Sequence, residues 1–293
     1  PFYIYYSMFG FQRVGDLCWL AGDIQAKGFL IGGTAGRTTL NGEGLQHQDG
    51  HSLILANTIP NCLSYDPTYA YEMAVIVHEG MRRMYENQEG VFYYITAMNE
   101  NYTHPAMPEG SEEGIIKGLY KLKAGGKHKV KAQLIGSGTI LREVEAAAEM
   151  LEKDWNVSAN VWSATSVNEL GREGMDVDRY NRLHPTAEKK RSYISECMDD
   201  QDGVVVASTD YMRLYAEQLR PWIKQRYVVL GTDGFGRSDT RERLRSFFEV
   251  DRYHVVVATL SALADEGTIK YDVVAKAIKQ YKIDADATNP VKV

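Results

Sequence analysis

The sequence predicts an α/β protein with mostly parallel sheets, organised in two units. Short apolar runs of strand length alternate with amphipathic runs of helical length, and such alternation indicates parallel strands joined by crossover helices. The chain has 293 residues, enough for about two units of 100–200 residues each. A stretch rich in Pro and Gly, 99–129, interrupts the alternation and indicates where one unit ends and the next begins.

The first half begins with an aromatic, β-rich run at 2–6, which predicts a strand. Apolar residues at helical spacing then predict a helix. A short apolar run closed by Gly32 and Gly33 predicts the next strand, and a polar, Gly-rich loop over 34–52 is long enough to be functional. Pro67 is a favoured first-turn residue and opens another helix. The expected helices are 11–27 and 68–86, and the expected strands are 2–6, 28–33, 61–65 and 91–97.

The second half resumes the same alternation after the interruption. We expect one short helix, 115–122, inside the interrupting stretch. Beyond it, the expected strands are 130–135, 160–165, 203–208, 227–230 and 254–258, and the expected helices are 139–153, 210–219, 240–247 and 273–281. The predicted organisation is therefore a first domain at 1–110, a linker at 111–128 and a second domain at 129–293.

Composition excludes several classes of protein. Hydrophobic residues make up 44% of the chain and charged residues 25%, which excludes disorder and coiled coil. No run of 18 apolar residues occurs, and the net charge of −6 argues against a nucleic-acid or membrane partner. The three cysteines lie far apart without metal-ligand spacing, as expected of reduced thiols in the cytoplasm. The chain begins at Pro1 inside a predicted strand, so we expect a piece of a longer protein.

Two glycine-rich turns follow predicted strands. Gly136 and Gly138 resemble the opening of a dinucleotide-binding turn, but Leu141 stands where the third glycine belongs, which favours a plain tight turn over a nicotinamide or flavin site. The turn at 231–240 enters a helix and lacks the GKS/T of a phosphate-binding loop. It predicts a structural turn or a contact between domains, with anion binding beside Arg237 as the alternative.

The loop over 38–52 carries the densest set of chemically active side chains. Glu43, His47, Asp49 and His51 lie within nine residues, among glycines that let the backbone approach a ligand. Histidine moves protons near neutral pH, so these residues are candidates for catalysis. A metal site and a merely hydrogen-bonded loop are the alternatives, and the residues lack the helical spacing of HExxH.

The aromatic run at 2–11 has two interpretations. Aromatic side chains in a strand usually belong to the core. The sharper hypothesis is a shelf on which a flat heterocycle stacks.

Five segments together resemble the decarboxylating first component of the pyruvate dehydrogenase complex, of the homodimeric bacterial type. The resemblance extends from Tyr3 to Asp284, and it covers only the C-terminal third or so of the family's chain. The segments are PFYIYYSMFGFQRVGDLCW, GFLIGGTAGRTTLNGEGLQHQDGHS, NENYTHPAMPEG, ASTDYMRLYAEQL and VLGTDGFGRSDTRERLR. The implied fold is the C-terminal half of a pyrimidine-binding domain for thiamine diphosphate, followed by a transketolase-type C-terminal domain.

The resemblance also implies roles for individual residues. Tyr6 and Phe9 match aromatics that flank the aminopyrimidine of thiamine diphosphate. His47 and Glu43 match an active-site histidine and acid, the histidine lying near the thiazolium and the substrate. By analogy with transketolases, Asp49 and His51 would belong to the same substrate loop.

The implied reaction is oxidative decarboxylation of pyruvate with reductive acetylation of a lipoyl group on the partner dihydrolipoamide acetyltransferase. The GDG…NN pattern that binds Mg²⁺-diphosphate does not occur in this sequence, and the glutamate that activates the cofactor lies upstream in the family. We therefore expect no metal site in this chain, and no turnover by this polypeptide alone. An inert dimerisation module is the alternative for the chain by itself. A transketolase is a further alternative, against which the GEGLQHQDGH loop argues.

Overall fold

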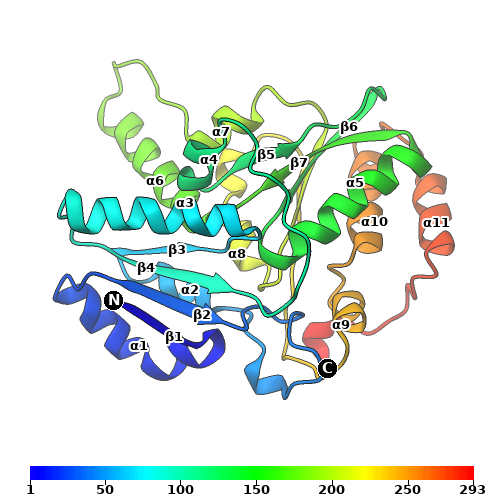
Figure 1. Ribbon diagram of the computed structural model, residues 1–293. Helices are drawn as coiled ribbons and strands as arrows, with labels where there is room; N and C mark the ends of the chain where they lie inside the picture. The colour runs from blue at the N-terminus through cyan, green and yellow to red at the C-terminus, as the bar shows by residue number, and fades with distance from the viewer.

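The computed structural model describes residues 1–293 and contains two sheets flanked by helices (Figure 1). The first sheet has the strand order β1-β2-β4-β3, and all its neighbouring strands are parallel. Its strands are β1 (Phe2–Tyr6), β2 (Phe29–Gly33), β3 (Cys62–Tyr65) and β4 (Phe92–Ala97). The four strands expected in this half of the chain are confirmed.

Helices cover both faces of this sheet. The first, α1 (Ser7–Asp23), begins directly after β1 and packs beside α2 (Ser52–Asn57). On the opposite face lies α3 (Ala70–Met81), which continues as a π-helical turn, η2 (Arg82–Glu86) (Figure 1). The Glu72 carboxylate accepts from the Tyr69 backbone N–H at 2.9 Å, which satisfies a free donor of the first turn of α3.

The second sheet has the strand order β5-β7-β6-β8-β9 and is parallel except at one edge. The strands are β5 (Tyr120–Lys123), β6 (Val130–Gly136), β7 (Val157–Ser163), β8 (Val204–Ser208) and β9 (Tyr227–Leu230). Only β5 is antiparallel to its neighbour. The predicted α/β class with a mostly parallel sheet is confirmed.

Helices also cover both faces of the second sheet. One face carries α5 (Leu141–Trp155), α10 (Arg252–Asp265) and α11 (Tyr271–Gln280), with a core rich in valine and leucine (Figure 1). The other face is covered by α6 (Val167–Leu183), α7 (Tyr193–Met198) and α8 (Leu214–Glu217). The core on this side also includes residues of α1, α2 and the first sheet, so the two sheets share buried apolar contacts. The remaining helices are α4 (Glu112–Lys117) and α9 (Arg241–Phe247).

The carboxyl ends of strands from both sheets meet at one junction. Asp66, which follows β3, donates its backbone N–H to the carbonyl oxygen of Thr165 beyond β7 at 2.7 Å. Gly138, beyond β6, donates its N–H to the Asp66 carbonyl at 3.2 Å. Arg37, beyond β2, donates to the Asp210 carbonyl beyond β8 at 3.3 Å. Ligand sites of open α/β sheets form at such strand ends, so this junction positions the loops described below.

Three expectations for individual elements are wrong or incomplete. Residues 254–258 are not a strand, because they lie in α10, where Asp251 accepts from the His254 N–H and caps the helix. The helix expected over 115–122 ends at Lys117, since Gly118 has a φ of +106° that ends the turn. Tyr120–Lys123 then forms β5, so the predicted linker contributes a strand to the second sheet.

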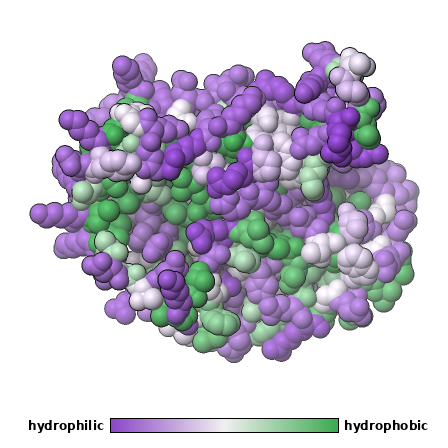
Figure 2. Space-filling model, turned by 180° about the vertical axis from the view of Figure 1, so that it is seen from behind, coloured by the Kyte–Doolittle hydropathy of each residue, from purple (hydrophilic) through white to green (hydrophobic).

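Apolar side chains remain exposed on the N-terminal elements. Ile4 in β1 is 71% exposed, and Ile24, which follows α1, is 67% exposed. β1 is an edge strand, which leaves one of its sides without a strand partner. On the reverse side of the molecule, Figure 2 shows apolar side chains lying between polar ones. No helix is both long and apolar enough to span a lipid bilayer.

Candidate functional site

Four of the predicted site residues lie together where β1 passes into α1. The ring of Tyr6 stacks on the imidazole of His47, with centroids 5.3 Å apart and planes inclined by 16°. Phe9 meets the same imidazole edge to face at 5.1 Å. The third member of the contact is Glu43, whose carboxylate lies 3.1 Å from Nδ1 of His47. Residues about 40 positions apart in the sequence thus form one aromatic and acid–base cluster.

The charge arrangement of the cluster sets what His47 can do. A carboxylate only accepts, so Nδ1 of His47 donates to Glu43 and carries the proton. This fixes the tautomer and leaves Nε2 available to a ligand. The His47 side chain is 25% exposed and that of Glu43 48%, so the pair is accessible to a small molecule. Arg13, over the Phe9 ring at 4.3 Å, adds a positive charge beside the cluster.

Asp49 is buried, unlike Glu43, the exposed acidic residue of the same loop. It is fully buried and accepts from the backbone N–H groups of His51 at 3.0 Å and Ser52 at 2.9 Å. The Ser52 hydroxyl also donates to it, and Tyr94 donates to that hydroxyl at 2.7 Å. Asp49 therefore holds the start of α2 and has no open side toward a ligand.

His51 lies beside this buried network. Its Nε2 contacts the Gln12 amide of α1. Burial lowers the pKa of His51, and the nearby Arg37 guanidinium lowers it further, against the opposite pull of Asp49. Burial thus favours the neutral imidazole at His51, and the contact with Gln12 joins the loop to α1.

The glycine turn after β6 is a contact between the sheets. Gly138 has a φ of +48°, and its carbonyl accepts from the Thr68 hydroxyl at 2.6 Å. A Cβ on Gly136 would lie 2.7 Å from Cα of Leu141, so the strand and the helix are in close contact despite Leu141. The turn is therefore a tight strand-to-helix connection, packed against Asp66 and Thr68, which follow β3.

The second glycine-rich turn, 231–240, lies against the His47 loop. The Arg237 N–H donates to the Gln48 side-chain oxygen at 2.6 Å, and the Gly42 N–H donates to the Asp239 carbonyl at 3.0 Å. The interpretation as a contact between domains is confirmed. Sequence reasoning missed Gln48, whose buried side chain gives no pattern in the chain.

The chain is similar to known protein families and to individual relatives. Residues 1–105 match the family model "Pyruvate dehydrogenase E1 component middle domain". Residues 118–251 match "Transketolase-like TK C-terminal domain". The pyruvate dehydrogenase E1 component of Pseudomonas aeruginosa is 64% identical over 99% of this chain, and that of Escherichia coli is 63% identical over 99%. The chain matches a C-terminal portion of pyruvate dehydrogenase E1 components.

The E1 relatives are longer than this chain, which spans about a third of their length (33% in both cases). Among solved structures, a Pichia stipitis transketolase in complex with sedoheptulose-7-phosphate aligns with a TM-score of 0.67 at 15% identity. That alignment covers 91% of this chain and 34% of the transketolase. The low identity restricts this likeness to the fold.

Thiamine diphosphate is the cofactor that the E1 resemblance implies, and one part of it fits this chain. Tyr6 is 49% exposed, so a flat heterocycle can stack on its open face. The rings of Tyr6 and Phe9 lie 6.1 Å apart and are inclined by 59°, which suits stacking on one ring more than parallel insertion between both. The chain has no group of three His, Cys, Asp or Glu residues arranged to hold a metal ion. The part of the cofactor that fits the residues of this chain is therefore its aromatic ring, which can stack on Tyr6.

Proposed function

We propose that this chain is a C-terminal portion of a thiamine-diphosphate-dependent pyruvate dehydrogenase (acetyl-transferring). In this proposal the enzyme decarboxylates pyruvate and reductively acetylates a lipoyl group on a dihydrolipoamide acetyltransferase. It acts as a homodimer in the cytoplasm, and Mg²⁺ and the diphosphate bind to residues outside this chain. The observation that carries the proposal is the contact of the Glu43–His47 pair with Tyr6 and Phe9.

Each residue of the cluster has a distinct task in the reaction. Thiamine diphosphate, when bound, supplies a nucleophilic carbon and an electron sink for decarboxylation. Tyr6 offers an open face on which the aminopyrimidine stacks, contributing about 0.5–1.5 kcal/mol beyond area burial, and the inclined Phe9 ring flanks it. Glu43 holds the Nδ1–H of His47, so Nε2 is an acceptor that can take a proton; once protonated, Nε2 can donate to the pyruvate carbonyl or carboxylate. Asp49 and His51 support this loop structurally. Asp49 anchors it to the start of α2, and His51 anchors it to α1.

The test is His47→Ala in the full-length protein that includes this chain. Removal of a positioned acid–base group lowers turnover by about 10²–10⁴-fold, so we expect pyruvate decarboxylation to fall by at least 100-fold. The thermal midpoint should change little, because the side chain has only one hydrogen bond and is partly exposed. The control is His184→Ala, a histidine that also stacks on a tyrosine, Tyr180, but lies at the C-terminal end of α6, outside the cluster. Turnover that is unchanged in His47→Ala would remove His47 from the site.

A further inference from the structure

The backbone of the His47 loop is held by the loop that follows β9 and by the first residue of α9. Two contacts fix its first half: the Gly42 N–H donates to the Asp239 carbonyl at 3.0 Å, and Nε of Arg241 donates to the Thr39 carbonyl at 2.7 Å. These partners come from a segment about 200 residues further along the chain. The conformation of 34–52 therefore depends on the second sheet.

The contact nearest to His47 is made by the next residue, Gln48. Its side chain is fully buried, and its Oε1 accepts from the Arg237 backbone N–H at 2.6 Å. Its Nε2 is buried without a partner, so the acceptor oxygen is the atom that this position uses. This side-chain hydrogen bond joins the residue immediately after the candidate acid–base group to the loop after β9, while the Gln48 N–H bonds locally to the Leu45 carbonyl at 3.3 Å.

Gly236 brings the two loops close enough for this bond. A Cβ at this position would lie 2.4 Å from the Leu45 carbonyl oxygen and 2.9 Å from Oε1 of Gln48. The first of these atoms is backbone and cannot rotate away, so any larger residue pushes the His47 loop outward. Glycine is required here for close approach rather than for a left-handed φ.

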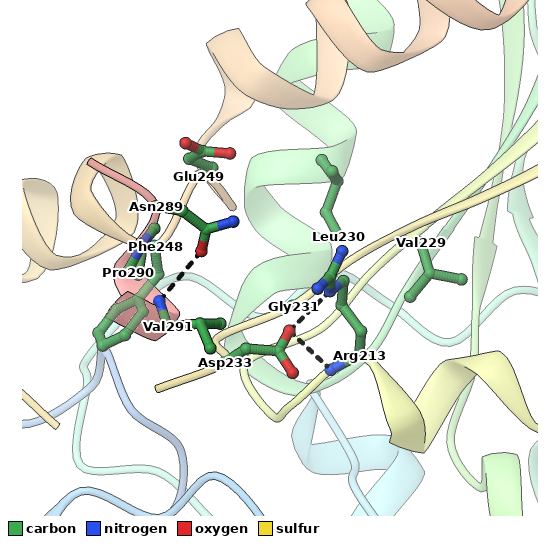
Figure 3. A pocket seen from close by; sticks show the side chains of 10 residues that line it. All are labelled: Arg213, Val229, Leu230, Gly231, Asp233, Phe248, Glu249, Asn289, Pro290 and Val291. Carbon is green, nitrogen blue, oxygen red and sulfur yellow. Dashed lines mark hydrogen bonds and ion pairs between the residues drawn. The ribbon is translucent and has the colours of Figure 1, made fainter. Parts of the chain in front are cut away.

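The loop after β9 is itself supported from its other side by the C-terminal tail (Figure 3). Asp233 accepts from Nε of Arg213 at 2.8 Å. Gly234 has a φ of +101°, and a Cβ there would lie 2.6 Å from the Pro290 carbonyl oxygen. Asn289 caps the short turn that contains Pro290 by accepting from the Val291 N–H at 3.0 Å. The residues just before Gly236 and Arg237 are therefore packed between Arg213 and the C-terminal turn.

From these contacts we propose that Gln48 and Gly236 are positioning residues for His47. The inference rests on the proposed function of the cluster. The His47 ring has one hydrogen bond, to the half-exposed Glu43, and its two aromatic contacts depend on where its backbone lies. The Gln48–Arg237 bond sets that backbone position and thereby the distance from Nε2 to the substrate. A shift of about 1 Å in a reacting group can lower the rate by about 100-fold.

The experiment compares Gln48→Met with Gln48→Glu in the full-length protein, supplied with thiamine diphosphate, Mg²⁺ and pyruvate. Methionine keeps the length of the side chain but lacks the acceptor, whereas glutamate keeps an acceptor oxygen. We expect kcat to fall by about 10- to 100-fold in Gln48→Met and to recover to within about 3-fold of the original in Gln48→Glu. Gly236→Ala should lower kcat by the same mechanism.

Gln225→Met is the matched control, because Gln225 also binds with one amide atom and leaves the other without a partner, but lies before β9, at the opposite end of that strand. It should change kcat by less than about 2-fold. The decisive measurement is Gln48→Met in the His47→Ala background. If Gln48 acts through His47, the double variant has the kcat of His47→Ala alone.

A further loss of kcat in the double variant, or an unchanged kcat in Gln48→Met, would overturn the inference. If His47→Ala itself leaves kcat unchanged, the proposed function of His47 fails instead. The two failures are thus distinguished. A loss of folded protein in Gln48→Met would be visible as a lower thermal midpoint, and in that case Gly236→Ala, combined with His47→Ala, gives the same test.

Discussion

Asp210 provides the sharpest test of how the two sheets are joined. It follows β8 and is 2% exposed. Its Oδ2 accepts from the Thr38 backbone N–H at 3.1 Å, and its Oδ1 has no partner. Burial raises the pKa of Asp210 from 3.8 to about 7, although the Arg245 charge and the Thr38 bonds pull it down. An ionised Asp210 is therefore a poorly compensated charge at the junction.

The direction of the pH effect follows from the two protonation states. Between the ordinary value of 3.8 and the folded value of about 7, the folded chain binds one more proton at Asp210 than the unfolded chain does. The free energy of unfolding falls by about 1.4 kcal/mol for each pH unit in this window and is constant above it. Over the roughly three pH units of this window, the whole effect of this carboxyl is about 4 kcal/mol.

The perturbation is Asp210→Asn, which keeps an acceptor for the Thr38 N–H and removes the titration. We expect the variant to gain stability relative to the original chain as the pH rises from about 4 to about 8, by about 4 kcal/mol in total. Urea denaturation followed by tryptophan fluorescence measures the difference at each pH. The exposed Asp272→Asn in α11 is the control. A difference between Asp210→Asn and the original that stays constant over this range would refute the reasoning.

Two further predictions concern other residues of the junction. Burial alone would raise the pKa of Glu100, but the bonds from Arg245 and Arg142 outweigh it and lower that pKa to about 2. Glu100→Gln should therefore reduce the free energy of unfolding by about 2–3 kcal/mol near pH 7, and the loss should shrink as the pH falls from about 4.5 towards 2; a pH-independent loss would contradict this. Gly136→Ala should destabilise by about 1–3 kcal/mol in thermal unfolding, because its Cβ would lie 2.7 Å from Cα of Leu141, while Gly15→Ala, with no atom within 4 Å of the new Cβ, should be neutral or stabilising.

The sequence alone predicts most of the parallel core but fails where local preference and burial conflict. Residues 255–257 are three consecutive valines, a β-branched run that favours a strand. They lie instead in α10, which packs between α5, α11 and β8, and a helix with buried neighbours on several sides loses its amphipathic pattern. The helix α6 was missed for the opposite reason, since its many charged residues mask the apolar stripe of Val167 and Leu170.

The candidate site could be predicted as a set of residues but not as an arrangement. The cluster of titratable residues in the loop, the aromatic run at 2–11 and the family resemblance suggested Tyr6, Phe9, Glu43 and His47, and the structure brings these four together. Asp49 lies in the same loop and has similar chemistry, yet it is buried as the anchor of α2. Only the folded structure shows that Glu43 and Asp49 have different roles, because nothing in the surrounding sequence distinguishes an exposed carboxylate from one that caps a helix.

One loop, 34–52, connects the junction of the sheets to the candidate site, but its contacts at the two places differ in charge. The loop of His47 leaves β2 at Gly33, passes Thr38 beside Asp210, and reaches Gln48 beside Arg237. The first contact includes a group that destabilises the junction when it ionises, whereas the second is a neutral hydrogen bond next to His47. Asp210→Asn should therefore raise stability above neutral pH without changing kcat, while Gln48→Met should lower kcat with little effect on the pH dependence of unfolding. If each variant changed both kcat and the pH dependence of unfolding, the two contacts would not have separate roles, and this reasoning would be wrong.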